Sequence, residues 1–161
     1  MIVVVIGGTR SGKSEIAEQV ASKLGEPVTV VVPAMAVDDE HSERIAQHRE
    51  RRPPSWATVE CGPDLLGALD TIRGTVLVDS LGTWVSASPS LDVDVGALLD
   101  VLHRRVDASV LVTEEVGLSV HPSTEVGRRF VDALGALNAA VAEIADEVLL
   151  VVAGRTLRLD P

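Results

Sequence analysis

Short runs of aliphatic, mostly β-branched residues recur along the chain. They cover residues 2–6, 28–32, 75–79, 109–113 and 147–152. Within each run the apolar residues follow one another instead of alternating with polar ones, which is typical of strands buried on both faces of a parallel sheet. Helix-like segments separate the runs. The pattern therefore predicts an α/β fold with a mostly parallel central sheet flanked by helices.

The clearest helical periodicity lies between residues 123 and 145, behind Ser123 as the expected N-cap. We expect its apolar face to pack on the sheet. The residues that recur at three- and four-residue steps on that face are Val126, Phe130, Leu134, Leu137, Val141 and Ile144. The segment AGRTLRL, residues 153–159, predicts a turn and a closing strand that form a C-terminal hairpin at the sheet edge.

The length of the chain predicts one domain spanning residues 1–161. We find no repeat, low-complexity tract or linker, and the loosest stretch is the Ser/Pro/Asp segment 86–95. The start, MIVVVIGG, has no basic leader and too few apolar residues for a signal peptide or a membrane span. We therefore expect a cytoplasmic protein.

Composition narrows the set of partners. The 24 acidic and 14 basic residues give a net charge of −10, which disfavours nucleic acids and acidic membrane surfaces as partners. Aromatic residues are too few to form stacking platforms for single-stranded nucleic acid. Cys61 is the single cysteine, so an intramolecular disulfide is excluded, and we expect Cys61 to be a half-buried small residue. Because the chain as a whole is negatively charged, any anionic ligand must be bound by a local site.

Residues 7–14, GGTRSGKS, provide such a local anion site. Gly7, Gly12, Lys13 and Ser14 satisfy the pattern G-x-x-x-x-G-K-[ST], with a strand before it and a helix after it. The glycines allow backbone N–H groups to surround phosphate oxygens, and Lys13 reaches the terminal phosphates. The sequence thus predicts a nucleotide-binding phosphate loop, and the alternative is a structural glycine turn.

A nucleotide-bound Mg²⁺ needs the Ser14 hydroxyl and an acidic side chain at a neighbouring strand end. Asp79 ends the run VLVD on the edge of the sheet where the phosphate loop is expected, although it could instead cap the next helix. Glu114 and Glu115 follow another run, and either could serve as a base, a metal ligand or a cap. We therefore predict Ser14 and Asp79 as the Mg²⁺ ligands.

Residues 38–53, DDEHSERIAQHRERRP, begin acidic and end basic, an order that suits the dipole of a solvated helix. His41, Arg44, Ile45 and His48 share one face at helical spacing. From the residues alone, His48 could be a surface residue, a phosphate contact or a nucleophile.

Four segments in this order resemble the bifunctional adenosylcobinamide kinase / adenosylcobinamide-phosphate guanylyltransferase family of cobalamin biosynthesis. They are GGTRSGKS, the stretch DDEHSERIAQHRERRPPSWATVE, VLVDSLGTWVS, and the C-terminal part from VTEEVG to VVAG. The resemblance spans nearly the whole chain. It implies a transferase that phosphorylates the aminopropanol hydroxyl of adenosylcobinamide, a corrinoid, with GTP or ATP. GMP from GTP then passes through a guanylyl-histidine to give adenosylcobinamide-GDP.

The resemblance also implies roles for individual residues. The family's guanylylated histidine lies in R-I-x-x-H-[KR]-x-x-R-P, which residues 44–53 match, so it assigns the nucleophile to His48. A neutral imidazole at pH 7 can form a labile phosphoramidate. Glu60 is implied as the acceptor for guanine N–H groups. The implied nucleotide contacts are Gly7, Gly8, Thr9, Arg10, Ser11, Gly12, Lys13, Ser14, Val32, Pro33, Ala34, Arg49, Glu50, Arg51, Arg52, Glu60 and Asp79.

The chain departs from the family pattern at two acidic positions. The family commonly reads N-E-V-G where this chain has residues 114–117, EEVG, and often has Glu at Asp79. The resemblance further implies a homotrimer. Two alternatives remain: a phosphate-loop kinase without the guanylyltransferase step, and a non-catalytic GTP-binding regulatory module. A covalent GMP adduct distinguishes the bifunctional enzyme from both.

Overall fold

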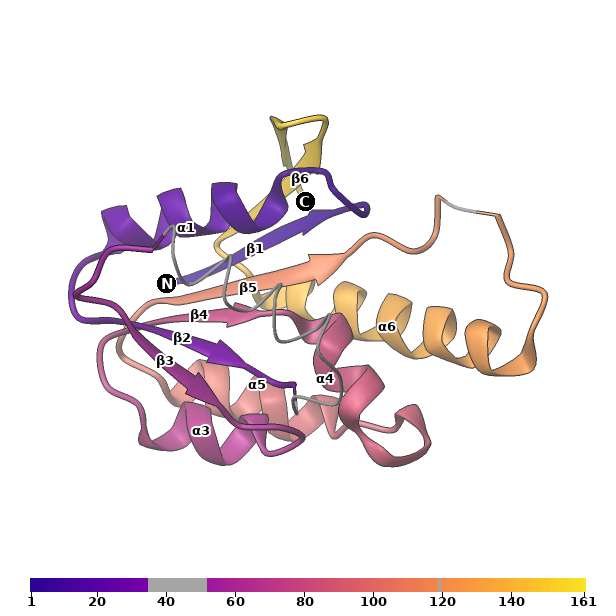
Figure 1. The fold of residues 1–161 in the computed structure, drawn as a ribbon, viewed down its shortest axis with the longest axis horizontal. Helices are drawn as coiled ribbons and strands as arrows, with labels where there is room; N and C mark the ends of the chain where they lie inside the picture. The colour runs from indigo at the N-terminus through magenta and orange to yellow at the C-terminus, as the bar shows by residue number, and fades with distance from the viewer. Residues whose placement is uncertain (35–51, 119) are drawn as a thin grey trace.

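The computed structural model describes residues 1–34, 52–118 and 120–161. Within these residues one seven-stranded sheet has the order β3-β2-β4-β5-β1-β6-β7 (Figure 1). All neighbouring pairs are parallel except β6 and β7. The strands are β1 (Ile2–Gly7), β2 (Val28–Val32), β3 (Ala57–Glu60), β4 (Thr75–Asp79), β5 (Ser109–Glu114), β6 (Glu147–Val152) and β7 (Arg155–Leu159).

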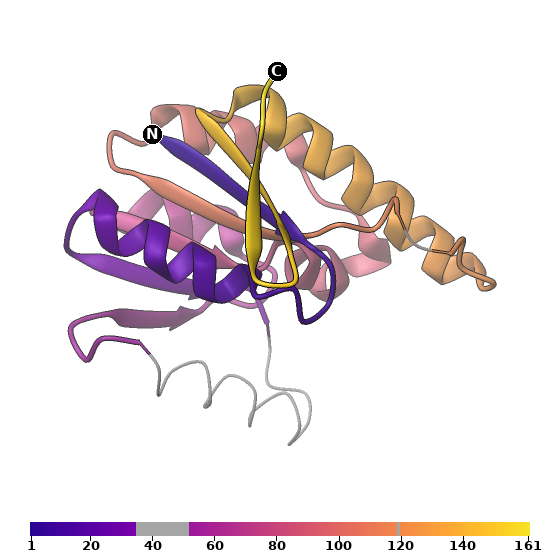
Figure 2. The ribbon, with the colours of Figure 1, turned by 90° about the horizontal axis from the view of Figure 1, so that it is seen from above.

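Helices cover both faces of this sheet. Figure 2 shows α1 on one face and α3, α4, α5 and α6 on the other. The helices are α1 (Lys13–Leu24), α3 (Leu65–Thr71), α4 (Leu81–Ala87), α5 (Val95–Arg104) and α6 (Glu125–Ile144). The predicted α/β class is therefore confirmed. Within the described residues, no helix has the length and apolar character needed to cross a membrane.

The continuous apolar runs are explained by the two cores. In β1, Val3 and Val5 pack with Ala17 and Ala21 of α1, whereas Val4 packs with the helices of the other face. Alternate side chains of a strand point to opposite faces, so a strand covered on both sides has to be apolar at every position. This burial confirms the five predicted strands, three of them with the predicted bounds.

Strand β3 was not anticipated from the sequence. It lies at the edge of the sheet beside β2, and most of its side chains are exposed. An exposed edge strand has no need of a continuous apolar run, so the signal that identified the other strands is missing.

The long helix begins later than predicted. Its N-cap is Thr124, whose Oγ1 accepts a hydrogen bond from the Gly127 N–H at 3.1 Å, so the assignment of Ser123 as N-cap is wrong. Leu134, Leu137 and Val141 are fully buried. Val126 is 65% exposed, so its expected packing on the sheet is also wrong. The first turns of α6 extend past the end of the sheet (Figure 1).

Two further local predictions hold, and one holds only in part. The C-terminal hairpin forms by antiparallel pairing of β6 with β7. Its turn residues Ala153 and Gly154 have φ values of 49° and 72°, the left-handed conformations that tight hairpin turns require. The segment 86–95 is a loop only in part, because it includes the end of α4, the short 3₁₀ turn η1 (Pro89–Leu91) and the first residue of α5. Cys61 is half-buried, and this burial raises the pKa of its thiol.

Candidate functional site

The ends of the parallel strands bring the predicted site residues to one edge of the sheet. In the register of the sheet, Gly7 of β1 lies beside Glu114 of β5, and Asp79 of β4 lies beside Val112. On the other side, Val32 of β2 lies beside Glu60 of β3. Ligands of open parallel sheets bind at this carboxyl edge.

The phosphate loop connects β1 to α1 at this edge. Gly7 is required by close packing, since a Cβ atom there would lie 2.6 Å from both Ser11 Oγ and the Val151 carbonyl oxygen. Gly12 has a φ of 93°, which disfavours any other residue. The Gly154 N–H donates to the Ser11 carbonyl at 2.8 Å, so the turn of the C-terminal hairpin supports the loop.

The start of α1 is open to an anion. Its N-cap is Gly12, which provides no side-chain hydrogen bond to the first turn. A phosphate can take that place, because the first N–H groups of a helix have no partner within the helix. Ser11 Oγ is buried and has no hydrogen-bond partner in the described part of the chain. Lys13 Nζ lies 3.4 Å from the Gly8 carbonyl oxygen, which folds the lysine back over the loop.

Asp79 lies beside the predicted metal ligand of the loop. Ser14 Oγ donates to Asp79 Oδ1 at 3.3 Å. The alternative that Asp79 caps the next helix is wrong, since Ser80 is the N-cap of α4 and accepts from the Thr83 N–H. A hydroxyl and a carboxylate fit Mg²⁺, which proteins usually hold through one or two carboxylates together with nucleotide phosphates. Within the described residues, no three potential ligands cluster to bind a metal without such phosphates.

Arg52 forms a buried bridge behind Asp79. Its Nη2 lies 3.2 Å from Asp79 Oδ2, and its Nε lies 3.0 Å from Glu18 Oε1 on α1. The Arg52 side chain is only 4% exposed. Glu18 was not predicted from the sequence, although it lies one helical turn after Ser14. In the described structure Arg52 thus contacts two carboxylates at the base of the site.

The structure separates the two adjacent glutamates after β5. Glu114 Oε1 lies 3.6 Å from Lys13 Nζ, and both carboxylate oxygens lie close to Ser80 Oγ, at 3.0 and 3.1 Å. Glu115 instead accepts hydrogen bonds from the Gly117 and Leu118 N–H groups of the following turn. Glu114 therefore faces the phosphate loop. Ser80, which contacts this carboxylate, is a second residue of the site that was not predicted from the sequence.

The structure describes only some of the other predicted nucleotide contacts. Val32, Pro33 and Ala34 are buried at the end of β2, and Glu60 is exposed at the end of β3. His48, Arg49, Glu50 and Arg51 lie outside the described residues.

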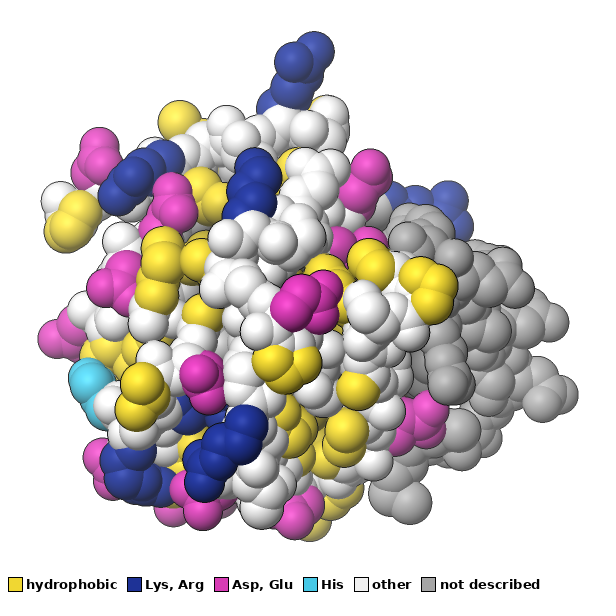
Figure 3. Space-filling view, turned by 90° about the vertical axis from the view of Figure 1, so that its left-hand side faces the viewer, with side chains coloured by type: hydrophobic (Ala, Val, Ile, Leu, Met, Phe, Trp, Pro, Cys, Tyr) yellow, Lys and Arg dark blue, Asp and Glu magenta, His cyan; other side chains and the backbone are white. Residues whose placement is uncertain are grey.

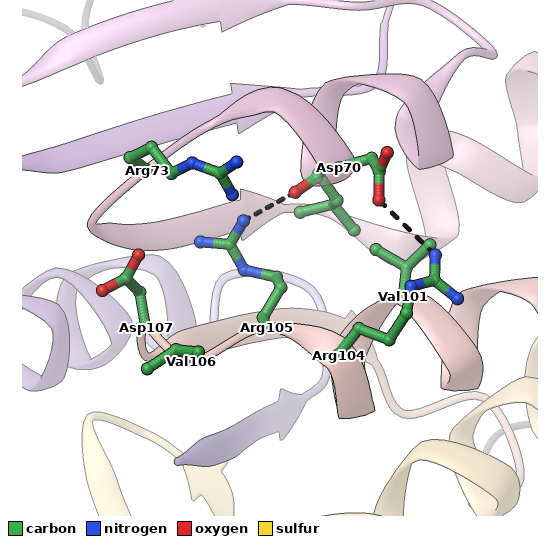
Figure 4. Close-up of a pocket in the computed structure, with 8 residues that line it drawn as sticks. Asp70, Arg73, Val101, Arg104, Arg105, Val106 and Asp107 are labelled. Atoms are coloured by element: carbon green, nitrogen blue, oxygen red, sulfur yellow. Dashed lines mark hydrogen bonds and ion pairs between the residues drawn. The ribbon is translucent and has the colours of Figure 1, made fainter.

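A hollow of about 300 Å³ lies at the opposite edge of the sheet between α3 and α5. Figure 4 shows Arg105 pointing from the C-terminal end of α5 toward the end of α3. Its guanidinium donates to the carbonyl oxygens of Leu69, Ile72 and Gly74 at 2.6 to 2.8 Å, and burial lowers its pKa. Acidic and basic side chains are interspersed on this side of the molecule (Figure 3). Arg105 thus joins elements of the fold at a distance from the phosphate loop.

Comparison with known proteins identifies relatives over nearly the whole chain. Residues 3–159 match the family described as cobinamide kinase / cobinamide phosphate guanyltransferase. The bifunctional adenosylcobalamin biosynthesis protein CobP of Pseudomonas aeruginosa is 38% identical over 96% of this chain and 95% of its own length. The bifunctional adenosylcobalamin biosynthesis protein CobU of Salmonella typhimurium is 32% identical, over 96% and 97%.

Solved structures with lower sequence identity share the fold. A type III secretion system ATPase of pathogenic bacteria superposes with a TM-score of 0.59 at 12% identity, covering 92% of this chain and 50% of that one. The flagellar accessory protein FlaH of Methanocaldococcus jannaschii gives a TM-score of 0.52 at 11% identity, over 96% and 74%. These similarities support a P-loop NTPase fold and carry no information on the substrate.

Proposed function

The chain belongs to the cobinamide kinase / cobinamide phosphate guanyltransferase family, and on this premise we propose that it catalyses both reactions in adenosylcobalamin biosynthesis. In the first, it phosphorylates the aminopropanol hydroxyl of adenosylcobinamide with GTP or ATP. In the second, it transfers GMP from GTP to that phosphate. One observation supports the proposal most directly. Ser14 of the phosphate loop contacts Asp79 in a chain that matches this family over residues 3–159.

In the kinase step, the loop backbone and the start of α1 bind the phosphates of the nucleotide. Lys13 neutralises charge on the terminal phosphates, and charge stabilisation of this kind is the main contribution of the protein to phosphoryl transfer. Ser14 and Asp79 would hold Mg²⁺, which would add positive charge next to the same phosphates. The substrate oxygen bonds to the γ-phosphorus while the bond to the leaving nucleoside diphosphate breaks.

In the guanylyltransferase step, we assign the nucleophile to His48. Its imidazole nitrogen attacks the α-phosphorus of GTP, pyrophosphate leaves, and the GMP passes to the corrinoid phosphate. We assign Arg49 and Arg51 to the charge on the phosphates and Glu60 to the guanine N–H groups. This assignment rests on the family motif.

The proposal also covers the substrates, the assembly and the location of the enzyme. GTP is the nucleotide of the second step, and the corrinoid is the small-molecule acceptor. We further propose a single domain over residues 1–161, a homotrimeric assembly and a cytoplasmic location. Light scattering of the purified protein measures the assembly directly, and a monomer would refute that part.

A labelling experiment tests the two reactions. We would incubate the protein with Mg²⁺ and α-³²P-labelled GTP, and then separate it by denaturing electrophoresis beside His48→Ala. We expect acid-labile, base-stable label on the wild type and none on the variant. Absence of label on folded wild type that binds GTP would remove the second step and favour the kinase alone. If cobinamide phosphorylation were also absent, the regulatory GTP-binding module would be favoured.

A further inference from the structure

The carboxylate of Asp79 is held at both oxygens. Its Oδ1 accepts a hydrogen bond from Ser14 Oγ at 3.3 Å, and its Oδ2 lies 3.2 Å from Arg52 Nη2. Ser14 is the other residue that fits Mg²⁺, so the Oδ1 side of the carboxylate faces the position of the metal. Arg52 binds the other oxygen. This contact therefore determines which oxygen of Asp79 is presented to a cation.

Arg52 is itself fixed by Glu18. The Arg52 Nε lies 3.0 Å from Glu18 Oε1, and the exposed fractions of the two side chains are 4% and 13%. Glu18 lies one turn after Ser14 on the same face of α1. The contacts thus form a closed ring that joins α1, the end of β4 and the segment before β3.

The charges of this ring show what Glu18 contributes. A guanidinium is always positively charged in proteins, so Arg52 paired with Asp79 alone would form a neutral unit that attracts a cation only weakly. Glu18 adds a second carboxylate, and the three side chains together carry a net charge of −1. The neighbouring pair of Lys13 and Glu114, 3.6 Å apart, is neutral by itself. Glu18 therefore preserves a negative charge that attracts a divalent cation to Asp79.

We propose that Glu18 is a positioning residue of the Mg²⁺–nucleotide site and acts through Arg52 on Asp79. The inference rests on the metal site of the proposed function, but it does not depend on which molecule accepts the phosphate. Arg52 keeps Asp79 Oδ1 directed at Ser14, while Glu18 holds Arg52 and balances its charge. Asp79 is thereby oriented without losing its attraction for the cation.

The contacts distinguish this role from direct metal binding by Glu18. The Glu18 carboxylate faces Arg52 Nε, and the guanidinium bridges Glu18 and Asp79. Within the part of the chain that the structure describes, no three His, Cys, Asp or Glu side chains are grouped to hold a metal. The family often has Glu in place of Asp79, and both residues provide a carboxylate.

Binding of β,γ-imido-GTP, a GTP analogue that is not hydrolysed, tests the proposal without any reaction. Its dissociation constant is measured with excess Mg²⁺ and with EDTA, and the ratio of the two constants gives the affinity gained from the metal. Glu18→Gln keeps the side-chain size and an acceptor for Arg52 but removes the charge. We expect the metal-dependent gain to fall about tenfold, while the constant in EDTA stays within about threefold of wild type. The control is Glu15→Gln, the same change at an exposed position of α1, which should leave the gain unchanged.

Glu18→Asp separates the effect of charge from that of packing. It keeps the charge and shortens the side chain, so the metal-dependent gain should stay within about threefold of wild type. A residue that only packs would tolerate Gln and not the shorter Asp, and that result would overturn the inference. So would a wild-type protein that gains no affinity from Mg²⁺. Wild-type protein that shows the expected gain but does not phosphorylate cobinamide would refute the proposed function and support the inference.

Discussion

The buried bridge of Arg52 predicts a large loss of stability when the guanidinium is removed. Arg52→Met keeps most of the side-chain volume and leaves Asp79 and Glu18 without their shared cation. The two contacts are 3.0 and 3.2 Å long, and the side chains are 4% exposed for Arg52, 13% for Glu18 and 15% for Asp79.

Each contact corresponds to a Coulomb attraction of about 5 kcal/mol at an effective dielectric constant of about 20. Desolvation of the three charges offsets much of that attraction in the intact protein. Removing one partner of a buried pair nevertheless costs about 3–5 kcal/mol, because uncompensated charge stays in the interior. Since both carboxylates keep some contact with water, we expect Arg52→Met to lower the free energy of unfolding by about 3 kcal/mol.

Urea unfolding followed by circular dichroism measures this change. The double variant Glu18→Gln/Arg52→Met should recover part of the loss, since it removes the charge of one of the two carboxylates that lose the Arg52 guanidinium. An unfolding free energy within about 0.5 kcal/mol of wild type for Arg52→Met would refute the reasoning, because a surface pair has that small an effect.

Three further predictions concern the loop, the core and the cysteine. Lys13→Ala should reduce cobinamide phosphorylation by about 10² or more through lost charge stabilisation at the terminal phosphates; steady-state kinetics that match wild type would contradict this role. Leu137→Ala, at a fully buried site, should lower the free energy of unfolding by about 2–5 kcal/mol in urea. Val126→Ala, at a site that is 65% exposed, should change it by less than about 0.5 kcal/mol; equal losses would refute the burial argument. Burial raises the pKa of the Cys61 thiol, so less thiolate is present at pH 8 than in a free cysteine. Iodoacetamide should therefore alkylate Cys61 more slowly than free cysteine, with a rate that rises with pH, as mass spectrometry can follow; an equal rate would contradict the shift.

The pattern of apolar residues along the chain determined most of the fold. A strand buried on both faces has to be apolar at every position, so β1, β2, β4, β5 and β6 are visible as runs. The exposed edge strand β3 has no such requirement and escaped prediction. The phosphate loop could also be predicted from the sequence, because its backbone geometry depends on consecutive residues such as Gly12 and Lys13.

Only the tertiary structure decided which charged side chains meet. Arg52 lies 34 residues from Glu18 and 27 from Asp79 in sequence, so no local pattern links the three. Glu114 and Glu115 are adjacent and chemically identical, and the sequence left their roles open. The end of β5 directs Glu114 toward Ser80 and Lys13 and leaves Glu115 in the following turn. The local pattern of residue types indicates burial and backbone conformation. The pairing of side chains from distant segments depends instead on how the strands and helices pack.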